Sequence, residues 1–151
     1  MNLLAGADTT AIALQAIFNQ LLRHPKVLAK LRLELDEAIR SGKITLPVRY
    51  ADASRLPYFT ACVKEATRLH PSVGLQMPRH PPPEGAELSG YYFPQTIRVG
   101  VNAVVLNRDT SIFGEDADKF NPERWTKPDA ANMDVSGAHN TFGNSPSARH
   151  T

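Results

Sequence analysis

The first residues able to do chemistry are an adjacent acid and alcohol, Asp8 and Thr9, which follow Gly6 at the head of a largely apolar stretch. In surroundings too dry for bulk water, a carboxylate and a hydroxyl can relay protons because each exchanges hydrogen bonds with its neighbours. Gly6 would let a ligand lie close to the backbone. Asp8 or Thr9 would serve equally well as a helix cap that satisfies free N–H groups at a helix start. The motif alone supports both interpretations in equal measure.

A second candidate is the carboxylate–guanidinium pair of Glu65 and Arg68, which lie three residues apart on a predicted helix. A surface ion pair with this spacing contributes only about 0.3 to 0.5 kcal/mol, and for the pair taken alone that interpretation is favoured. However, Cys62, Glu65 and Leu69 share one stripe of the helix, which places the carboxylate at the edge of the apolar face. A buried carboxylate needs a counter-charge and hydrogen bonds. We therefore expect Glu65 to be partly buried and paired.

Two further arginines, Arg124 and Arg79, follow this helix in the chain. Arg124 lies in the irregular segment Phe120–Trp125, and a second guanidinium on Glu65 would lock that segment to the helix. The alternative is a solvated turn in which Trp125 is a lone surface anchor. Arg79 would either clamp an anionic group or be exposed, and exposure is the simpler interpretation.

Helices must position most of these side chains, because only three of the 12 prolines precede residue 70. The apolar spacing and the proline positions predict helices over Ala11–Leu22, Pro25–Arg40 and Leu56–His70. The first helix is apolar on most sides, which is typical of a helix buried inside a protein. The second is amphipathic, with Lys30 and Glu34 as an i,i+4 ion pair on its wetter face. The third carries Glu65 and Arg68.

The second half of the chain predicts a small sheet followed by irregular structure. A hairpin is expected from Gly90–Phe93 and Thr96–Val101, joined by a turn at Pro94-Gln95. After one short apolar run, Ala103–Leu106, the sequence is polar and rich in turn residues. The expected fold class is therefore mainly α with a small β-sheet.

Composition narrows the function classes further. The 151 residues are enough for one domain. The 17 basic and 15 acidic residues give a net charge of +2, and no tract of the chain is densely basic. Nucleic-acid binding is therefore not expected. The single cysteine, Cys62, excludes an internal disulfide and a Cys-rich zinc site, and we interpret it as a small buried apolar residue. Polar side chains interrupt the stretch 1–22 too often for a membrane-spanning helix, and neither an anchor nor a secretory leader is expected.

Taken together, the order and spacing of these motifs resemble the C-terminal part of a cytochrome P-450, a haem-thiolate monooxygenase, in a fungal-type form. The resemblance extends to about Gly143, over Ala5–Thr10, Glu65-Ala66-Thr67-Arg68, Pro122–Trp125 and the run Asn107–Asp118. It implies an incomplete cytochrome P-450 fold over residues 1–143, with 144–151 as a divergent tail in place of the haem-binding loop.

The resemblance also implies roles for individual residues. Asp8 and Thr9 would be the acid and alcohol of proton delivery during oxygen activation. Glu65, Arg68 and Arg124 would form the structural triad of the family. Contacts with the haem would come from Gly6, Arg79, Phe142 and Gly143.

The match fails at the position of the iron ligand. The family expects Phe-Gly-x-Gly-x-Arg-x-Cys, whereas this chain continues from Phe142-Gly143 to Arg149 at the cysteine position. A permanent cation cannot replace a thiolate, and the adjacent His150 would lack the electron donation of a thiolate. We therefore expect no residue of this chain to be a metal ligand.

The functional expectations follow from that resemblance. Family members insert one oxygen atom from O2 into a small organic substrate, using haem b and electrons from a reductase, and full-length members lie at the endoplasmic reticulum membrane. Both ends of this chain look cut, and we expect the chain to be inactive. Its expected location is cytoplasmic or unknown. The alternatives are a helical remnant that binds a partner such as the reductase, or an unfolded orphan product. The partner would be bound through four basic residues, Arg23, Lys26, Lys30 and Arg32.

Overall fold

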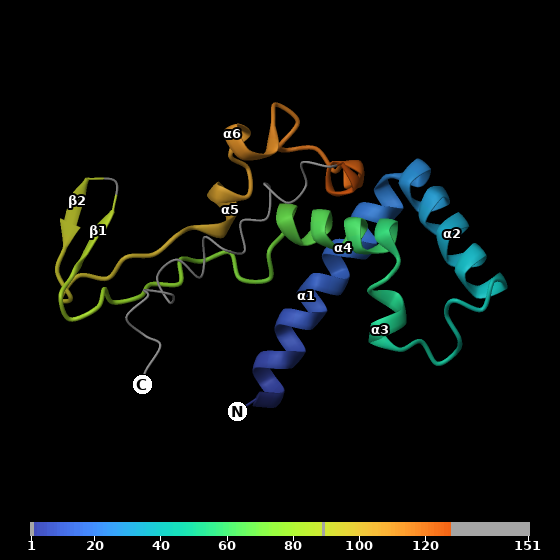
Figure 1. Cartoon of the computed structure of the whole chain (residues 1–151), viewed down its shortest axis with the longest axis horizontal. Coiled ribbons are helices and arrows are strands. Elements are labelled where there is room, and N and C mark those ends of the chain that lie inside the picture. The colour runs from blue at the N-terminus through green and yellow to red at the C-terminus, as the bar shows by residue number, and fades with distance from the viewer. Residues whose placement is uncertain (1, 89, 128–151) are drawn as a thin grey trace.

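The computed structural model describes residues 2–88 and 90–127 of the chain. The described part is mainly helical, with one small antiparallel sheet (Figure 1). Its elements in chain order are α1 (Asn2–Arg23), α2 (Pro25–Arg40), α3 (Tyr50–Ala53), α4 (Pro57–Leu69), β1 (Ala86–Leu88), β2 (Tyr91–Phe93), α5 (Ala103–Leu106), α6 (Thr110–Phe113) and the 3-10 helix η1 (Pro122–Thr126). The predicted fold class is confirmed.

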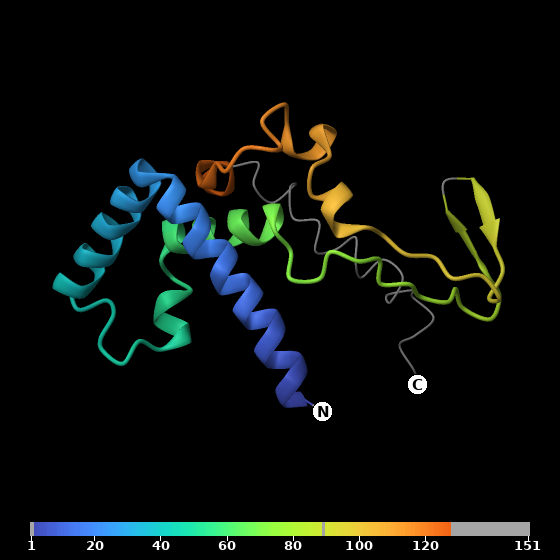
Figure 2. The same ribbon diagram turned by 180° about the vertical axis from the view of Figure 1, so that it is seen from behind.

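Helices α1, α2 and α4 come together at one end of the molecule, and the hairpin lies at the other (Figures 1 and 2). Their shared core contains Leu21 from α1, Leu31 from α2, and Tyr58 and Cys62 from α4. Burial of such apolar side chains, at roughly 25 cal/mol per Å², is what holds helices of this length together. The same packing brings α4 against η1, although the two are far apart in sequence.

Prolines set the helix boundaries that the sequence predicts. Pro25 and Pro57 occupy the first turns of α2 and α4, where a missing N–H costs nothing. His24, immediately before Pro25, has the non-helical torsion angles φ −124° and ψ 74°, so α1 ends at Arg23. At the other end of α2, Gly42 takes a φ of 71°, which suits a residue without a side chain.

Helix α1 begins earlier than predicted, at Asn2 rather than Ala11. No proline interrupts this stretch, and Gly6 weakens a helix by only about 1 kcal/mol relative to alanine. Asp8 and Thr9 consequently lie inside α1. The capping interpretation of these two residues is wrong, because a capping residue must precede the first helical turn.

The predicted hairpin is wrong in its partner strand. Strand Tyr91–Phe93 does form, but it pairs with the preceding strand, Ala86–Leu88, rather than with the residues that follow. Gly90 decides the register, since its φ of 79° permits the tight turn between the two strands. The predicted turn after Phe93 does form, with the Ile97 N–H donating to the Pro94 carbonyl at 3.1 Å. It leads to Arg79 and not back to the strand, because Val99 exchanges two backbone hydrogen bonds with Arg79 at 2.8 and 2.9 Å.

Candidate functional site

The carboxylate of Glu65 lies at the centre of the described structure, with none of the residue exposed to solvent. Its Oε1 accepts hydrogen bonds from Arg68 Nη2 at 2.9 Å, the Asn121 backbone N–H at 3.0 Å and Arg124 Nε at 3.0 Å. Its Oε2 accepts from Arg68 Nε and Trp125 Nε1, at 2.9 and 2.8 Å. We call Glu65, Arg68, Arg124 and Trp125 the Glu65 cluster. It joins α4 to η1.

The two guanidinium groups of the cluster also bind backbone carbonyl groups from distant segments. Arg68 Nη1 donates to the carbonyl oxygens of Asn107 and Ala117, at 2.5 and 2.6 Å. Arg124 donates to the carbonyl of Phe113 and, from Nη2, to that of Asp116 at 3.0 Å. Each arginine therefore uses its planar fork both to neutralise the carboxylate and to fix an irregular segment.

Burial and charge act in opposite directions on the Glu65 carboxyl. Burial alone would raise its pKa, because desolvation disfavours the charged form. The hydrogen bonds from Arg68, the Asn121 N–H and Trp125, together with the positive charge of Arg68, outweigh it and hold the pKa of Glu65 below its ordinary value. The cluster is thus an ionised, fully hydrogen-bonded group, and no described buried side-chain N or O atom lacks a partner.

This arrangement suits a structural role better than a catalytic one. Both carboxylate oxygens are occupied by five donors, and the side chains of Arg68 and Arg124 are 3% and 4% exposed. A substrate would have no route to the ionised groups. The predicted proximity of Glu65, Arg68 and Arg124 is confirmed, and the alternative of a solvated turn around Trp125 is wrong.

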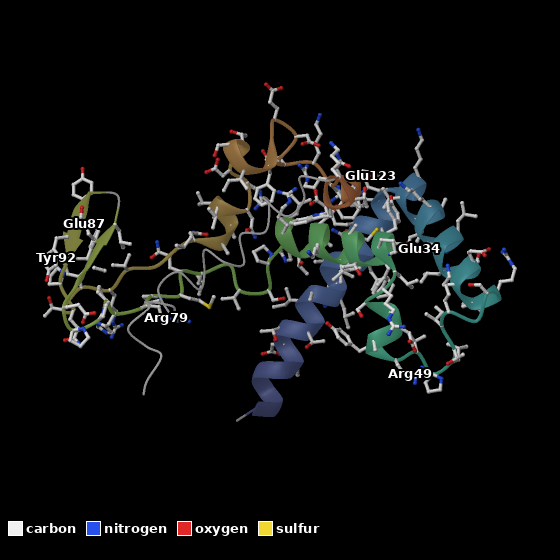
Figure 3. All side chains as sticks on the ribbon, viewed as in Figure 1. Glu34, Arg49, Arg79, Glu87, Tyr92 and Glu123 are labelled. Atoms are coloured by element: carbon white, nitrogen blue, oxygen red, sulfur yellow. The ribbon has the colours of Figure 1, made fainter. Side chains whose placement is uncertain are left out.

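A second polar network, joining α2 to η1, is absent from the sequence-based predictions. Lys30 Nζ and the Tyr58 hydroxyl both donate to Glu123 Oε1, at 2.9 and 3.0 Å, and the Lys30 ammonium lies 4.2 Å from the Tyr58 ring centroid. Glu34 accepts instead from the backbone N–H groups of Tyr58 and Phe59, at 2.9 and 2.7 Å (Figure 3). The predicted Lys30–Glu34 pair is wrong, because each side chain finds a better partner outside its own helix.

The acid and alcohol of α1 lie apart from the Glu65 cluster, on an exposed part of the helix. The hydroxyl of Ser72 donates to the Thr9 carbonyl oxygen at 2.9 Å and thereby connects the segment after α4 to α1. An ideal Cβ built on Gly6 would meet no heavy atom within 4 Å, so the space beside this glycine is open.

Arg79 is exposed, as the simpler interpretation holds, and lies in the extended segment before the hairpin (Figure 3). Its backbone is paired with Val99, while its Nη1 contacts the carbonyl of the preceding Pro78 at 3.5 Å. Phe142, Gly143, Arg149 and His150 lie outside the described residues.

Cys62 is buried, with 1% of the residue exposed, in the core between α1, α2 and α4. Burial, aided by the negative charges of Glu123 and Glu34, raises the pKa of this thiol to about 12. It remains protonated at neutral pH, and its burial in the core keeps it out of contact with solvent. In the described part of the chain, no group of three or more His, Cys, Asp or Glu side chains is placed to hold a metal ion.

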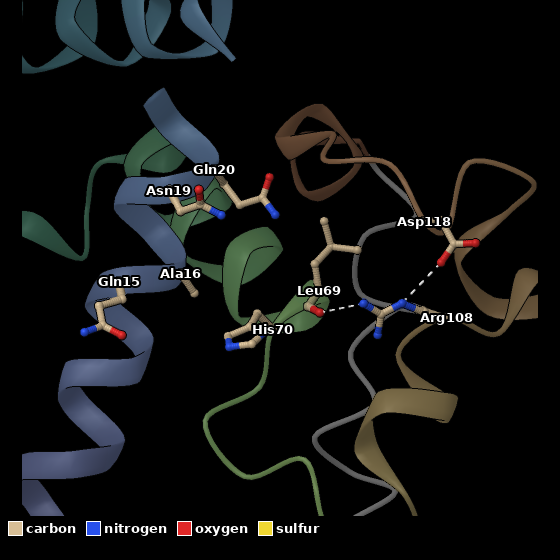
Figure 4. Close-up of a pocket in the computed structure, with 8 residues that line it drawn as sticks. All are labelled: Gln15, Ala16, Asn19, Gln20, Leu69, His70, Arg108 and Asp118. Carbon is tan, nitrogen blue, oxygen red and sulfur yellow. Dashed lines mark hydrogen bonds and ion pairs between the residues drawn. The ribbon is translucent and has the colours of Figure 1, made fainter. Parts of the chain in front are cut away.

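A polar pocket of about 400 Å³ lies between α1 and the end of α4 (Figure 4). Arg108 lines the side of the pocket opposite α1 (Figure 4). Its Nη2 donates to the Leu69 carbonyl at 2.8 Å, and its Nε lies 3.2 Å from Asp118 Oδ1. Side chains from α1 that line it are Gln15, Ala16, Asn19 and Gln20. It includes neither Asp8 nor the Glu65 cluster.

None of the described helices has the length and apolar character needed to cross a membrane.

Comparison with known proteins places these features in one family. A sequence model of cytochrome P450 matches residues 1–146. The chain is 46% identical over 132 residues to the cytochrome P450 monooxygenase gsfF of Penicillium aethiopicum, covering 87% of this chain and 26% of that protein. It is 41% identical over 138 residues to a pisatin demethylase of Fusarium vanettenii, covering 91% and 26%.

A solved structure agrees with these sequence relatives. A zebra fish cytochrome P450, determined with progesterone, matches with a TM-score of 0.69 and 30% identity, over 82% of this chain and 28% of that one. The chain thus spans about a quarter of the length of the proteins it matches.

Proposed function

This chain belongs to the cytochrome P450 family, and from that premise we propose that it carries the oxygen-activation helix and the structural triad of a monooxygenase. The enzyme would insert one oxygen atom from O2 into a small organic substrate, with electrons from a reductase. The observation that carries the proposal is the Glu65 cluster, in which one buried carboxylate holds two arginines from separate segments. Residues 1–143 would form this partial domain, and 144–151 a divergent tail.

We propose that Asp8 and Thr9 are the acid and the alcohol of proton delivery during oxygen activation. They lie side by side in α1, where a carboxylate can take up a proton and a hydroxyl can both donate and accept one. The open space beside Gly6 leaves room for a flat cofactor or substrate to approach the helix. The Glu65 cluster would contribute indirectly, by fixing η1 against α4, the helix on which α1 packs.

The haem of this family supplies oxygen-activating iron when it is bound. Of the described residues, Arg79 offers an exposed cation for a carboxylate and Gly6 offers close approach, so these two fit such a group. Cys62 does not fit as the iron ligand, because it lies on α4 and is buried in the core between α1, α2 and α4. We propose that these 151 residues by themselves form no thiolate–haem centre and have no monooxygenase activity.

The reduced carbon monoxide difference spectrum of the purified chain, supplied with haem, tests this. We expect no thiolate-type Soret band. Arg149→Cys is the matched variant, since it puts a thiol where the family has its ligand, and a band confined to that variant would support the assignment of residue 149. Absence of the band in both chains would mean that further parts of the haem site are missing. A thiolate-type band from the unmodified chain would refute the proposal.

A second candidate function, docking of a reductase or similar acidic partner, rests on the basic side chains around the α1–α2 junction. Arg23, Lys26 and Arg32 are exposed. Lys30 is committed to Glu123 within the fold and is therefore left out of this group. Reversing the three remaining charges should abolish capture by a reductase, whereas reversing Lys43, Arg55 and Lys127 should not. Equal binding by both triple variants would dismiss this function.

A further inference from the structure

One contact between α1 and the segment after α4 has no place in the proposed function so far. The Ser72 hydroxyl donates to the Thr9 carbonyl oxygen at 2.9 Å, across 63 residues of sequence. Ser72 is partly buried and lies three residues beyond the last residue of α4. The bond therefore reaches from the segment just after the helix that carries Glu65 to the peptide that joins Thr9 to Thr10.

This bond acts on a carbonyl that is already in use within α1. In an α-helix the carbonyl of residue i accepts from the N–H of residue i+4, which for Thr9 is Ala13. A carbonyl oxygen has two lone pairs, so it can accept the Ser72 hydroxyl as well. A side chain that enters the helical ladder tilts the carbonyl outward and lengthens the intrahelical bond. Ser72 thus bears directly on the turn that carries the acid and the alcohol.

The end of α4, which lies just before Ser72, is itself fixed from the Glu65 side. The last carbonyl groups of α4 are held by Asn107 Nδ2, which donates to Arg68 O at 3.1 Å, and by Arg108 Nη2, which donates to Leu69 O at 2.8 Å. Arg68 in turn is held by Glu65. The end of α4 is therefore fixed from the Glu65 cluster, and His70 and Pro71 connect it covalently to Ser72, which binds Thr9.

We propose that Ser72 is a positioning residue for the acid and alcohol of α1. Its hydroxyl holds the Thr9 carbonyl so that the Asp8–Thr9 turn keeps a fixed place relative to the end of α4. The functional meaning of this placement rests on the proposed role of Asp8 and Thr9 in proton delivery, but the contact itself can be tested separately.

The sequence provides a selective probe of the contact. Thr9-Thr10 is the one Thr-Thr step in the chain. Threonine labelled with 13C at the carbonyl and 15N at the amide therefore gives a single carbonyl–amide correlation, from Thr9 C=O to Thr10 N–H. We expect its 13C shift to move upfield in Ser72→Ala, because the carbonyl loses a hydrogen bond, and to return in Ser72→Thr, which keeps a hydroxyl. Ser54→Ala is the matched control, since Ser54 donates to the Ala51 carbonyl and not to α1.

The possible outcomes are distinct. An unchanged Thr9 carbonyl shift in Ser72→Ala, or a shifted one that Ser72→Thr fails to restore, overturns the proposal. Loss of the helical circular dichroism in Ser72→Ala but not in Ser54→Ala also overturns it, because Ser72 would then be needed for folding rather than for placement. If proton delivery by Asp8 and Thr9 were disproved, the carbonyl shift would persist, so the two failures can be told apart.

Discussion

Replacing Glu65 by glutamine tests the centre of the structure with little change in volume. The amide oxygen can keep the place of Oε1 and its three donors. The amide NH2 must then take the place of Oε2, where Arg68 Nε and Trp125 Nε1 now donate at 2.9 and 2.8 Å. Donor would face donor, two hydrogen bonds would be lost, and both Arg68 and Arg124 would lose their buried counter-charge.

Removing one partner from a buried ion pair costs about 3 to 5 kcal/mol, mostly from the charge left uncompensated. Domains are stable by only about 5 to 15 kcal/mol, so Glu65→Gln should remove a large part of the free energy of unfolding. Urea unfolding followed by tryptophan fluorescence would report on the cluster directly, because Trp125 is the single tryptophan of the chain. Far-UV circular dichroism gives an independent second reading, and an unchanged m-value would show that the unfolded state is unaltered.

The matched control for this substitution is Glu37→Gln. Glu37 also pairs with an arginine three residues away, but its side chain is 58% exposed. Such a surface pair contributes about 0.3 to 0.5 kcal/mol. If Glu65→Gln lowered the free energy of unfolding by no more than this control does, the argument that the buried carboxylate holds α4 and η1 together would be refuted.

Three further predictions follow from individual side chains. Because the pKa of Glu65 is held below its ordinary value, the stability that its charge contributes is complete at neutral pH and is lost as the pH falls below about 4. In Glu65→Gln the free energy of unfolding should therefore fall less steeply as the pH is lowered. Glu34→Ala leaves the N–H groups of Tyr58 and Phe59 without their carboxylate, which should cost about 1 kcal/mol in urea unfolding. Cys62, with a pKa of about 12, should react with a thiol reagent at pH 8 only when urea unfolds the chain.

Each of these measurements has a contrary outcome. Equal acid sensitivity of the wild type and Glu65→Gln would mean that other carboxylates govern acid unfolding. A Glu34→Ala chain as stable as the wild type would show that water caps α4 equally well. Rapid modification of Cys62 in the native chain would mean that the core between α1, α2 and α4 opens easily.

Local chemistry made the helices predictable. Pro25 and Pro57 mark the starts of α2 and α4, because the proline ring fixes φ and removes a backbone N–H donor. The Glu65–Arg68 pair was also accessible from sequence, since a spacing of three is close in any helix. The partner of strand Tyr91–Phe93 was not: turns form at both Gly90 and Pro94, and only the turn at Gly90 joins two paired strands.

Long-range polar contacts left weaker traces in the sequence. Lys30 and Glu34 satisfy the i,i+4 rule, yet Lys30 binds Glu123 and Glu34 caps α4. The carbonyl groups that Arg68 binds, those of Asn107 and Ala117, give no signal at all, because every residue has a carbonyl. The Ser72–Thr9 bond is equally silent, as serine occurs in many loops.

The sequence by itself determined where the helices lie, which residues could be acid, alcohol and counter-charge, and which family the motifs resemble. All of these depend on neighbours within a few residues or on the order of motifs. Only the tertiary structure decided that five donors surround one carboxylate with no solvent exposure. The physical reason is that desolvation and hydrogen-bond satisfaction are properties of the whole packed environment, which exists only after residues 56 and 59 positions apart have come together.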